Sequence, residues 1–181
     1  MAKPIVYIMM GLPGSGKSTF AKKQRNAHLC SADEVRREWF GDESLQYTEA
    51  FLVSRGIDTA GMSDLEKRQS AHAFVWGEVK RRAMDALKRG ENIVIDGVNS
   101  SRRDRMSWIE TASACAVIHG IWLNTPAEVC IERDRRRTRH VSEEIIRRFA
   151  KNFQEPSLEE GFDILEIHNQ NGELVSRVTK E

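Results

Sequence analysis

The sequence predicts an α/β fold: a three-layer sandwich whose mostly parallel, five-stranded sheet is covered by helices on both faces. Short apolar runs alternate with segments of helical periodicity, which is typical of strand–helix–strand units. The runs are continuously apolar, as in parallel strands that are buried on both faces. The expected strands cover residues 4–10, 27–31, 92–97, 115–124 and 162–169.

Length and composition indicate one soluble domain over residues 1–181. Lys and Arg number 28 against 27 Asp and Glu, so the net charge of +1 provides no global attraction for a polyanion. Binding of nucleic acid would need a local basic patch. The three cysteines form no CxxC pair, and no run approaches the roughly 20 apolar residues of a membrane span. These features predict a cytoplasmic protein with reduced thiols and no membrane partner; they do not indicate an oligomeric state.

Capping signals place the main helices. The longest is expected to begin at Ser63, where Ser63 and Glu66 can form a capping box, and its buried face follows an i, i+4 pattern through Ala71, Val75, Val79, Ala83 and Leu87. Two further helices are expected after Thr125, which precedes a proline, and after Ser142, which precedes two acids. Asn-Gly at residues 171–172 predicts a terminal hairpin.

The stretch GLPGSGKST, residues 11–19, follows the first predicted strand and opens a helix expected to run from Lys17 to about Arg25. It matches G-x-x-x-x-G-K-[ST], the phosphate-binding P-loop, in the structural context that the motif requires. Glycines let backbone N–H groups converge on phosphate oxygens, while Lys17 would reach the β- and γ-phosphates and Ser18 would ligate Mg²⁺. A flexible turn would not need the complete pattern. We therefore expect ATP and Mg²⁺ as cofactors, held by Gly11, Pro13, Gly14, Ser15, Gly16, Lys17, Ser18 and Thr19.

Asp33 and Arg36 are candidates for the acceptor side of a phosphoryl transfer. Asp33 follows the second predicted strand, and ligands of open α/β sheets bind outside the carboxyl ends of strands. A carboxylate there could accept the proton of an attacking hydroxyl, and Arg36, one helical turn later, could hold an acceptor phosphate. The alternative is structural, with Ser31 and Glu34 as a capping box and Asp33 as a favourable first-turn acid.

The third predicted strand ends in a second group of candidates. Asp96 follows three apolar residues, the layout of an acid that holds Mg²⁺ through water, and Asn99 could orient the acceptor. Arg102, Arg103 and Arg105 follow, and we expect Arg103 to bind substrate. The alternative is a loop with a capping Asn and a solvated basic helix.

Five of the seven residues 133–139 are Arg. Such a run is commonly a solvated helix face. Because it precedes the helix expected after Ser142, we predict a mobile, Arg-rich helical lid over about residues 133–142. Arg133 and Arg137 would share a helix face and stabilise charge on the transferring phosphoryl group.

In this order and spacing, the motifs GLPGSGKST, SADEVR, VIDGVN, RDRRRTRHVSEEII and FQEPSLEEGFD resemble the small P-loop kinases of the polynucleotide-kinase type. The related AAA_33 and zeta-toxin-like ATP-binding phosphotransferases, including phage DNA kinases, form a looser group around them. The resemblance covers about residues 4–168. It implies that Asp33 is the general base, that Arg36 contacts the acceptor phosphate, and that Arg133 and Arg137 are lid arginines. It also implies that the segment with Phe153, Glu155 and Pro156 runs past the adenine.

The acceptor remains open at this stage. Val98 stands where the family often has Thr, and residues 41–63 match nothing in the family pattern. A nucleic acid is favoured, DNA over RNA, through a 5′-hydroxyl end or a hydroxymethyl group such as that of 5-hydroxymethyluracil in phage DNA. A local basic patch for it could include Arg36, Arg37, Arg102, Arg103 and Arg105. The alternatives are a kinase of a nucleoside, sugar, antibiotic or nucleotide-sugar, and an ATP-binding regulatory module without catalysis.

Overall fold

The computed structural model describes residues 2–24, 26–41, 49–138 and 140–180. The contacts of the chain divide it into two compact units. The first unit comprises Met1–Leu29 and Ala86–Glu181, and the second unit comprises Cys30–Asp85.

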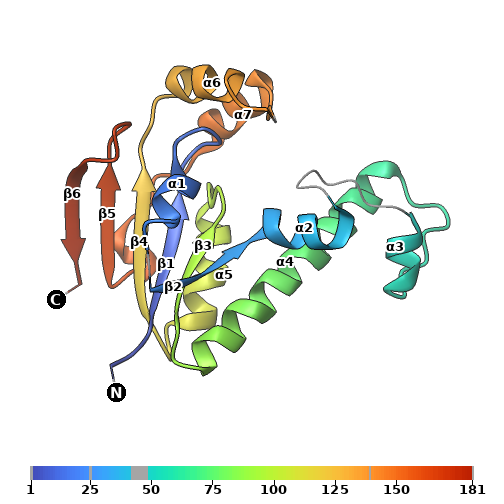
Figure 1. Ribbon diagram of the computed structural model, residues 1–181, viewed down its shortest axis with the longest axis horizontal. Coiled ribbons are helices and arrows are strands. Elements are labelled where there is room, and N and C mark those ends of the chain that lie inside the picture. The colour runs from blue at the N-terminus through green and yellow to red at the C-terminus, as the bar shows by residue number, and fades with distance from the viewer. Residues whose placement is uncertain (1, 25, 42–48, 139, 181) are drawn as a thin grey trace. The chain divides into compact units, whose positions relative to one another are not determined.

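The sheet has six strands in the order β2-β3-β1-β4-β5-β6 (Figure 1). β1 pairs in parallel with β3 and with β4, and β4 pairs in parallel with β5. β6 runs antiparallel to β5. The prediction of five strands is therefore corrected to six, because the predicted terminal hairpin adds an edge strand. The strands are β1 (Ile5–Met10), β2 (Ala27–Ser31), β3 (Asn92–Asp96), β4 (Val117–Leu123), β5 (Ile164–His168) and β6 (Leu174–Thr179).

Both faces of the central strands are buried, as their continuous apolar sequences predict. On one face, Met9, Val94 and Ile121 pack with Ala21 and Phe20 of the first helix. Side chains alternate along a strand, so Ile8, Ile95 and Ile118 point to the opposite face, where none of them is exposed to solvent. The alternating strands and helices thus form the predicted layered α/β fold.

The helices of the first unit are α1 (Lys17–Ala21), α5 (Arg102–Ala112), α6 (Ala127–Arg135), α7 (Glu143–Asn152) and a short 3₁₀ helix, η1 (Leu158–Glu160). Ser142 caps α7 as predicted, accepting a hydrogen bond from the Ile145 N–H at 3.4 Å. The predicted cap at Thr125 is wrong, because α6 is preceded by Pro126 and has no side-chain cap. α1 ends at Ala21, earlier than predicted; Arg25 lies outside the described residues.

The second unit contains α2 (Ala32–Phe40), α3 (Glu49–Ser54) and most of α4 (Asp64–Lys88). The capping box that begins α4 is confirmed: Glu66 accepts from the Ser63 N–H at 2.7 Å, and the Ser63 hydroxyl accepts from the Glu66 N–H at 3.3 Å. The predicted buried face of α4 is confirmed as well, since all five of its residues are at most 6% exposed. α3 lies in the stretch that matched no family pattern.

Within the described residues, no helix is long and apolar enough to cross a membrane.

Candidate active site

The P-loop connects β1 to α1 and depends on backbone conformations that favour glycine. Gly11, Gly14 and Gly16 have φ values of 141°, 86° and 101°. A Cβ at Gly11 would lie 2.7 Å from the Leu123 carbonyl oxygen, and one at Gly14 would lie 2.5 Å from the Cys130 carbonyl oxygen. Conformation therefore favours glycine at all three positions, and space requires it at Gly11 and Gly14 as well.

Lys17 is the buried cation of this loop. Its ammonium group donates a hydrogen bond to the Leu12 carbonyl at 2.7 Å, which folds the side chain back across the loop. Ser18 and Thr19 follow at the exposed start of α1. Gly16 precedes the helix without a side-chain cap, so the first-turn N–H groups donate no hydrogen bond to a capping side chain. This arrangement of amides and one cation suits an anion of several phosphate groups.

Two side chains hold the P-loop from outside. The Thr125 hydroxyl donates to the Ser15 carbonyl at 3.2 Å, and Arg133 donates to the same oxygen at 3.3 Å. Arg133 also donates to the Gln170 carbonyl at 2.8 Å. The sequence did not indicate that Thr125 contacts the loop, because its hydroxyl was assigned to a helix cap.

The predicted lid differs from the structure at its beginning. Arg133 belongs to the last turn of α6 and is anchored to the P-loop, whereas Arg137 lies beyond the end of that helix at Arg135. The two arginines therefore do not share a helix face. Arg137 is exposed, and its guanidinium forms no ion pair within the described part of the chain. Arg135 pairs with Glu143 at 2.8 Å, which links α6 to α7.

Burial raises the pKa of the Cys130 thiol, while the charges of Lys17, Arg133 and Arg137 oppose that rise. The Cys130 carbonyl is the group that closes the space beside Gly14. Lys17, Arg133 and Arg137 thus all contribute positive potential at Cys130, next to the P-loop. A polyphosphate bound to the loop would experience the same positive potential.

The end of β3 lies beside the P-loop. The sheet pairs Ile95 with Ile8, so the half-buried Asp96 directly follows this pair, and the Gly11 N–H donates to the Val98 carbonyl at 3.2 Å. Asn99 has a φ of 45° and donates from its buried side chain to the Met9 carbonyl at 2.7 Å. Its amide nitrogen therefore joins two strand ends; a contact of Asn99 with the acceptor stays a prediction.

Arg105 does not belong to an exposed basic patch, which corrects the expectation from the sequence. It is completely buried and binds both carboxylate oxygens of Glu160 at 2.6 Å. It also donates to the carbonyls of Asn99 at 3.1 Å and Gln154 at 2.8 Å. The sequence did not reveal this role, because Glu160 is 55 residues away. Arg103, in contrast, is 93% exposed.

An aromatic pair lies where the resemblance implies the adenine segment. Phe153 stacks on Trp122 with ring centroids 5.6 Å apart and an angle of 14° between the planes. Phe153 also packs against the buried cluster that contains Leu12 of the P-loop. Trp122 was not among the predicted site residues.

The acceptor-side candidates lie in the second unit, on α2. Arg36 donates to the Asp33 carboxylate at 2.8 Å and also lies 3.2 Å from Nδ1 of His72, a residue that the sequence did not single out. The Arg36 side chain is 13% exposed and that of Asp33 is 49% exposed. Arg36 Nε is buried and has no hydrogen-bond partner within the described residues. Asp33 therefore presents a half-exposed carboxylate that is paired with the nearly buried guanidinium of Arg36. The Asp33 N–H donates to the Ser31 hydroxyl at 3.2 Å, so Ser31 caps α2; the capping box of Ser31 with Glu34 stays a prediction.

The fold and the phosphate-binding loop together define a P-loop protein. Residues 6–156 match the AAA_33 family, which is described as an AAA domain, and the chain belongs to this family.

Two curated proteins align with 89% of the chain. Transcription factor bHLH140 of Arabidopsis thaliana is 26% identical over 169 residues, and a bifunctional polynucleotide phosphatase/kinase of Schizosaccharomyces pombe is 24% identical over 167 residues. The chain spans only 15% and 32% of their lengths. A solved structure of the Pnkp1/Rnl/Hen1 RNA repair complex aligns with the whole chain and with 50% of its own chain, at 23% identity and a TM-score of 0.64. That likeness shows the fold.

Proposed function

We propose that this protein is an ATP- and Mg²⁺-dependent kinase that transfers the γ-phosphoryl group to the 5′-hydroxyl of a polynucleotide. The observation that carries the proposal is the Asp33–Arg36 ion pair on α2, since it combines an accessible base with a cation suited to an acceptor phosphate. The similarity to a protein named as a polynucleotide phosphatase/kinase supports a strand end over a modified base as the acceptor.

The donor side fits a triphosphate. The amides around Gly14 and Gly16 and the ammonium of Lys17 would hold the β- and γ-phosphates, and Ser18 and Asp96 would hold Mg²⁺, Asp96 through water. ATP with Mg²⁺ supplies the phosphoryl group and neutralises part of its charge.

On the acceptor side, the oxygen of the 5′-hydroxyl attacks the γ-phosphorus, and Asp33 accepts the proton of that hydroxyl. The bond between the γ-phosphorus and the β–γ bridging oxygen breaks. Arg36 binds the acceptor phosphate next to that hydroxyl, and Asn99 and Arg103 are further candidates for contact with the strand. Arg133 stabilises the phosphoryl group from its anchored position above Ser15, and Arg137 does so from the exposed segment after α6.

The first experiment measures transfer from γ-labelled ATP to separate acceptors: 5′-hydroxyl DNA, 5′-hydroxyl RNA, duplex DNA with 5-hydroxymethyluracil, and a pool of nucleosides and sugars. We expect label on a 5′-hydroxyl strand, with strand binding that weakens steeply as salt rises. Label in the small-molecule pool alone, or ATP binding without any transfer, would overturn the proposal.

Asp33→Asn tests the base directly. It should keep ATP binding and lose transfer by about 10²–10⁴-fold, because removing a general base leaves the P-loop intact. Asp64→Asn, which removes an exposed carboxylate from the same unit, is the matched control and should keep full activity. Full activity of Asp33→Asn would exclude Asp33 as the base.

A further inference from the structure

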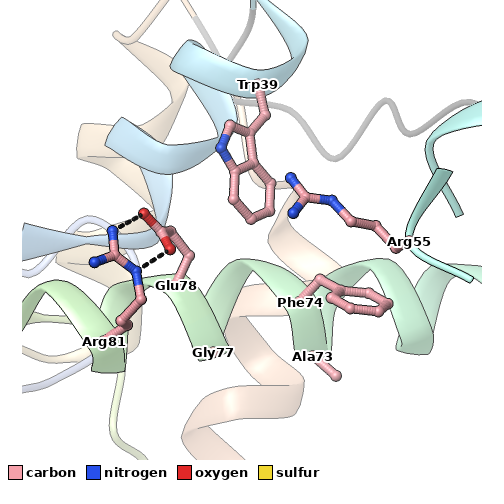
Figure 2. A pocket seen from close by; sticks show the side chains of 7 residues that line it. All are labelled: Trp39, Arg55, Ala73, Phe74, Gly77, Glu78 and Arg81. Carbon is pink, nitrogen blue, oxygen red and sulfur yellow. Dashed lines mark hydrogen bonds and ion pairs between the residues drawn. The ribbon is translucent and has the colours of Figure 1, made fainter.

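The second unit has a cavity of about 350 Å³. Figure 2 shows Trp39 projecting from α2 toward the turn of α4 that carries Gly77. The lining residues are Trp39, Arg55, Ala73, Phe74, Gly77, Glu78 and Arg81. Small-molecule sites span about 300–1,000 Å³, so this cavity suits a ligand group of one or two rings.

Gly77 keeps the floor of the cavity open. It lies inside α4, where glycine weakens a helix relative to alanine. A glycine in a helix commonly allows another element to approach closely, but a Cβ placed here would meet no atom within 4 Å. Neither a positive φ nor close packing explains the glycine. The missing side chain instead leaves open space beneath Trp39.

The opposite wall is aromatic and carries a cation. The Arg55 guanidinium lies 4.7 Å from the ring centroid of Trp39 and 5.2 Å from that of Phe51. Among the described residues, no carboxylate is within ion-pair distance of Arg55. Its planar group therefore packs against aromatic faces, and no carboxylate of the described residues accepts a hydrogen bond from its N–H groups.

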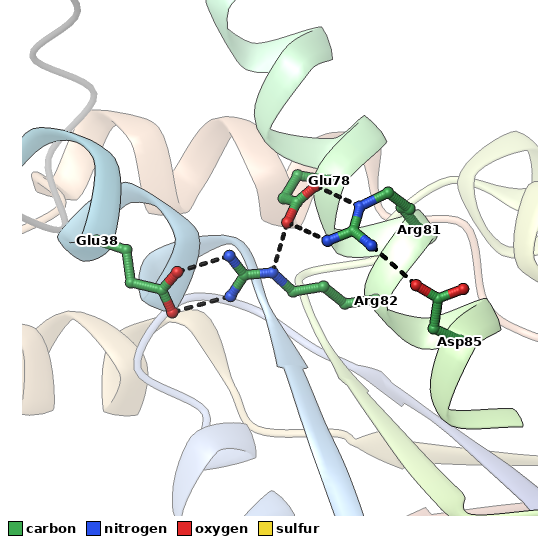
Figure 3. A network of polar contacts seen from close by, with 5 residues as sticks. All are labelled: Glu38, Glu78, Arg81, Arg82 and Asp85. Atoms are coloured by element: carbon green, nitrogen blue, oxygen red, sulfur yellow. Dashed lines mark hydrogen bonds and ion pairs between the residues drawn. The ribbon is translucent and has the colours of Figure 1, made fainter. Parts of the chain in front are cut away.

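The other two charged residues that line the cavity, Glu78 and Arg81, bind each other and charged neighbours outside it, as Figure 3 shows. Glu78 accepts hydrogen bonds of 2.8 Å from both Arg81 and Arg82. Arg81 donates further to Asp85 at 2.8 Å, and Arg82 donates to Glu38 at 2.6 and 2.8 Å. Arg81 is thus compensated by two carboxylates. Arg55 is the cavity-lining cation for which the described residues supply no counterion, which favours a ligand with negative charge.

We propose that this cavity binds an unpaired base of the acceptor strand, between Trp39 and the floor at Gly77, with Arg55 at its edge. The proposal rests on the proposed function. Trp39 follows Asp33 by six residues on α2, about 9 Å along the helix axis. A strand whose 5′-hydroxyl reaches Asp33 would bring one of its first bases near Trp39.

A base fits this chemistry better than an aliphatic group does. Base-on-aromatic stacking tolerates any sequence, since every base has a π-face, and arginine adds a cation–π contribution. The charge of Arg55, for which the described residues provide no carboxylate partner, complements the phosphates that flank the base. The cavity would thus position the end of the strand without reading its sequence.

The test measures binding of 3′-fluorescein-labelled, 5′-hydroxyl single strands by anisotropy. Each strand of a series lacks one base at position one, two or three. Removing the base that occupies the cavity should weaken binding to the unaltered protein by about tenfold, within a range of about 5- to 100-fold. Gly77→Phe, which fills the cavity, should weaken binding of the intact strand by a similar factor and lose sensitivity to that abasic position.

Matched controls isolate the cavity. Gln69→Phe introduces the same side chain at an exposed position of α4. Arg55→Ala removes the cation of the cavity and should weaken binding of the intact strand; its control, Arg68→Ala, removes an exposed charge of α4. Both controls should bind the strands as the unaltered protein does. Circular dichroism checks that Gly77→Phe folds, and the abasic series on the unaltered protein needs no variant.

The outcomes separate the two proposals. If the strands are phosphorylated, but abasic strands bind as tightly as the intact strand and Gly77→Phe binds as tightly as the unaltered protein, the cavity site is overturned. The proposed kinase activity would be unaffected by that result. In another outcome, the abasic position and Gly77→Phe both weaken strand binding, but no strand is phosphorylated. This result would support the base-binding cavity and overturn the proposed kinase activity. Absence of strand binding would overturn both.

Discussion

The candidate site of the first unit is formed mainly by backbone groups, whereas that of the second unit is formed by side chains. In the first unit, the P-loop is shaped by backbone conformation and by carbonyl oxygens that leave no room for a side chain at Gly11 or Gly14. In the second unit, the candidate acceptor groups are side chains on helix surfaces, such as Asp33, Arg36 and Trp39. A backbone site tolerates few residues, whereas a helix surface can change its side chains and keep its fold. This explains why a short motif reveals the donor side and leaves the acceptor open.

Charged groups show the same contrast. The first unit buries the Arg105–Glu160 pair completely, and the second unit carries a partly exposed network around Glu78. A buried pair that loses one member leaves an uncompensated charge without water, while water replaces a lost partner at the surface.

The largest expected difference between the units concerns these pairs. Arg105→Ala should lower the free energy of unfolding by about 3–5 kcal/mol, because Glu160 stays buried without its cation. Arg82→Ala, in the network of the second unit, should lower it by about 0.2–1 kcal/mol. Urea unfolding of both variants provides the comparison. Similar losses in the two would show that burial does not distinguish the pairs.

Alanine at two glycines should have effects of opposite sign. Gly14→Ala should destabilise by about 1–3 kcal/mol, because its φ is 86° and its Cβ would meet the Cys130 carbonyl. Gly77→Ala should stabilise by about 0.5–1 kcal/mol, since it lies in a helix with open space around it. Thermal unfolding measures both. Destabilisation by Gly77→Ala would mean that the space beside α4 is smaller than the structure shows.

Acid should weaken the second unit through Glu78. Hydrogen bonds from Arg81, followed by those from Arg82, lower the pKa of Glu78 to about 2. A carboxyl whose folded pKa is lowered stabilises the protein above its unfolded pKa of about 4.3. This contribution is lost as pH falls from about 4 toward about 2. The midpoint of unfolding should therefore decline less steeply over this range in Glu78→Gln. Identical declines in the two proteins would contradict the role of Glu78.

The smallest effect concerns the rates at which the thiols react. Burial, followed by the charge of Glu34, raises the pKa of Cys30 to about 12, and burial raises the pKa of Cys130. Cys115 is exposed. Alkylation near pH 8, followed by peptide mass spectrometry, should modify Cys115 first. Faster modification of Cys30 than of Cys115 would indicate local opening of the second unit.

Much of the fold could be predicted because it depends on local signals. The apolar runs identified the strands, Ser63 and Glu66 identified the start of α4, and the Asn-Gly pair identified the hairpin that adds β6. These features involve residues close in sequence. The failures at Thr125 and Arg105 have the opposite origin, since their partners lie 110 and 55 residues away.

The sequence by itself determined the layered α/β fold and the P-loop, because strand periodicity, glycine conformations and helix caps act over a few residues. Only the tertiary structure decided that Arg133 is anchored to the P-loop, that Arg105 is a buried partner of Glu160, and that Trp39 and Gly77 border one cavity. Those contacts join distant segments. These contacts depend on the burial of side chains and on the proximity of residues that are distant in sequence, and both arise only when the chain is folded and packed.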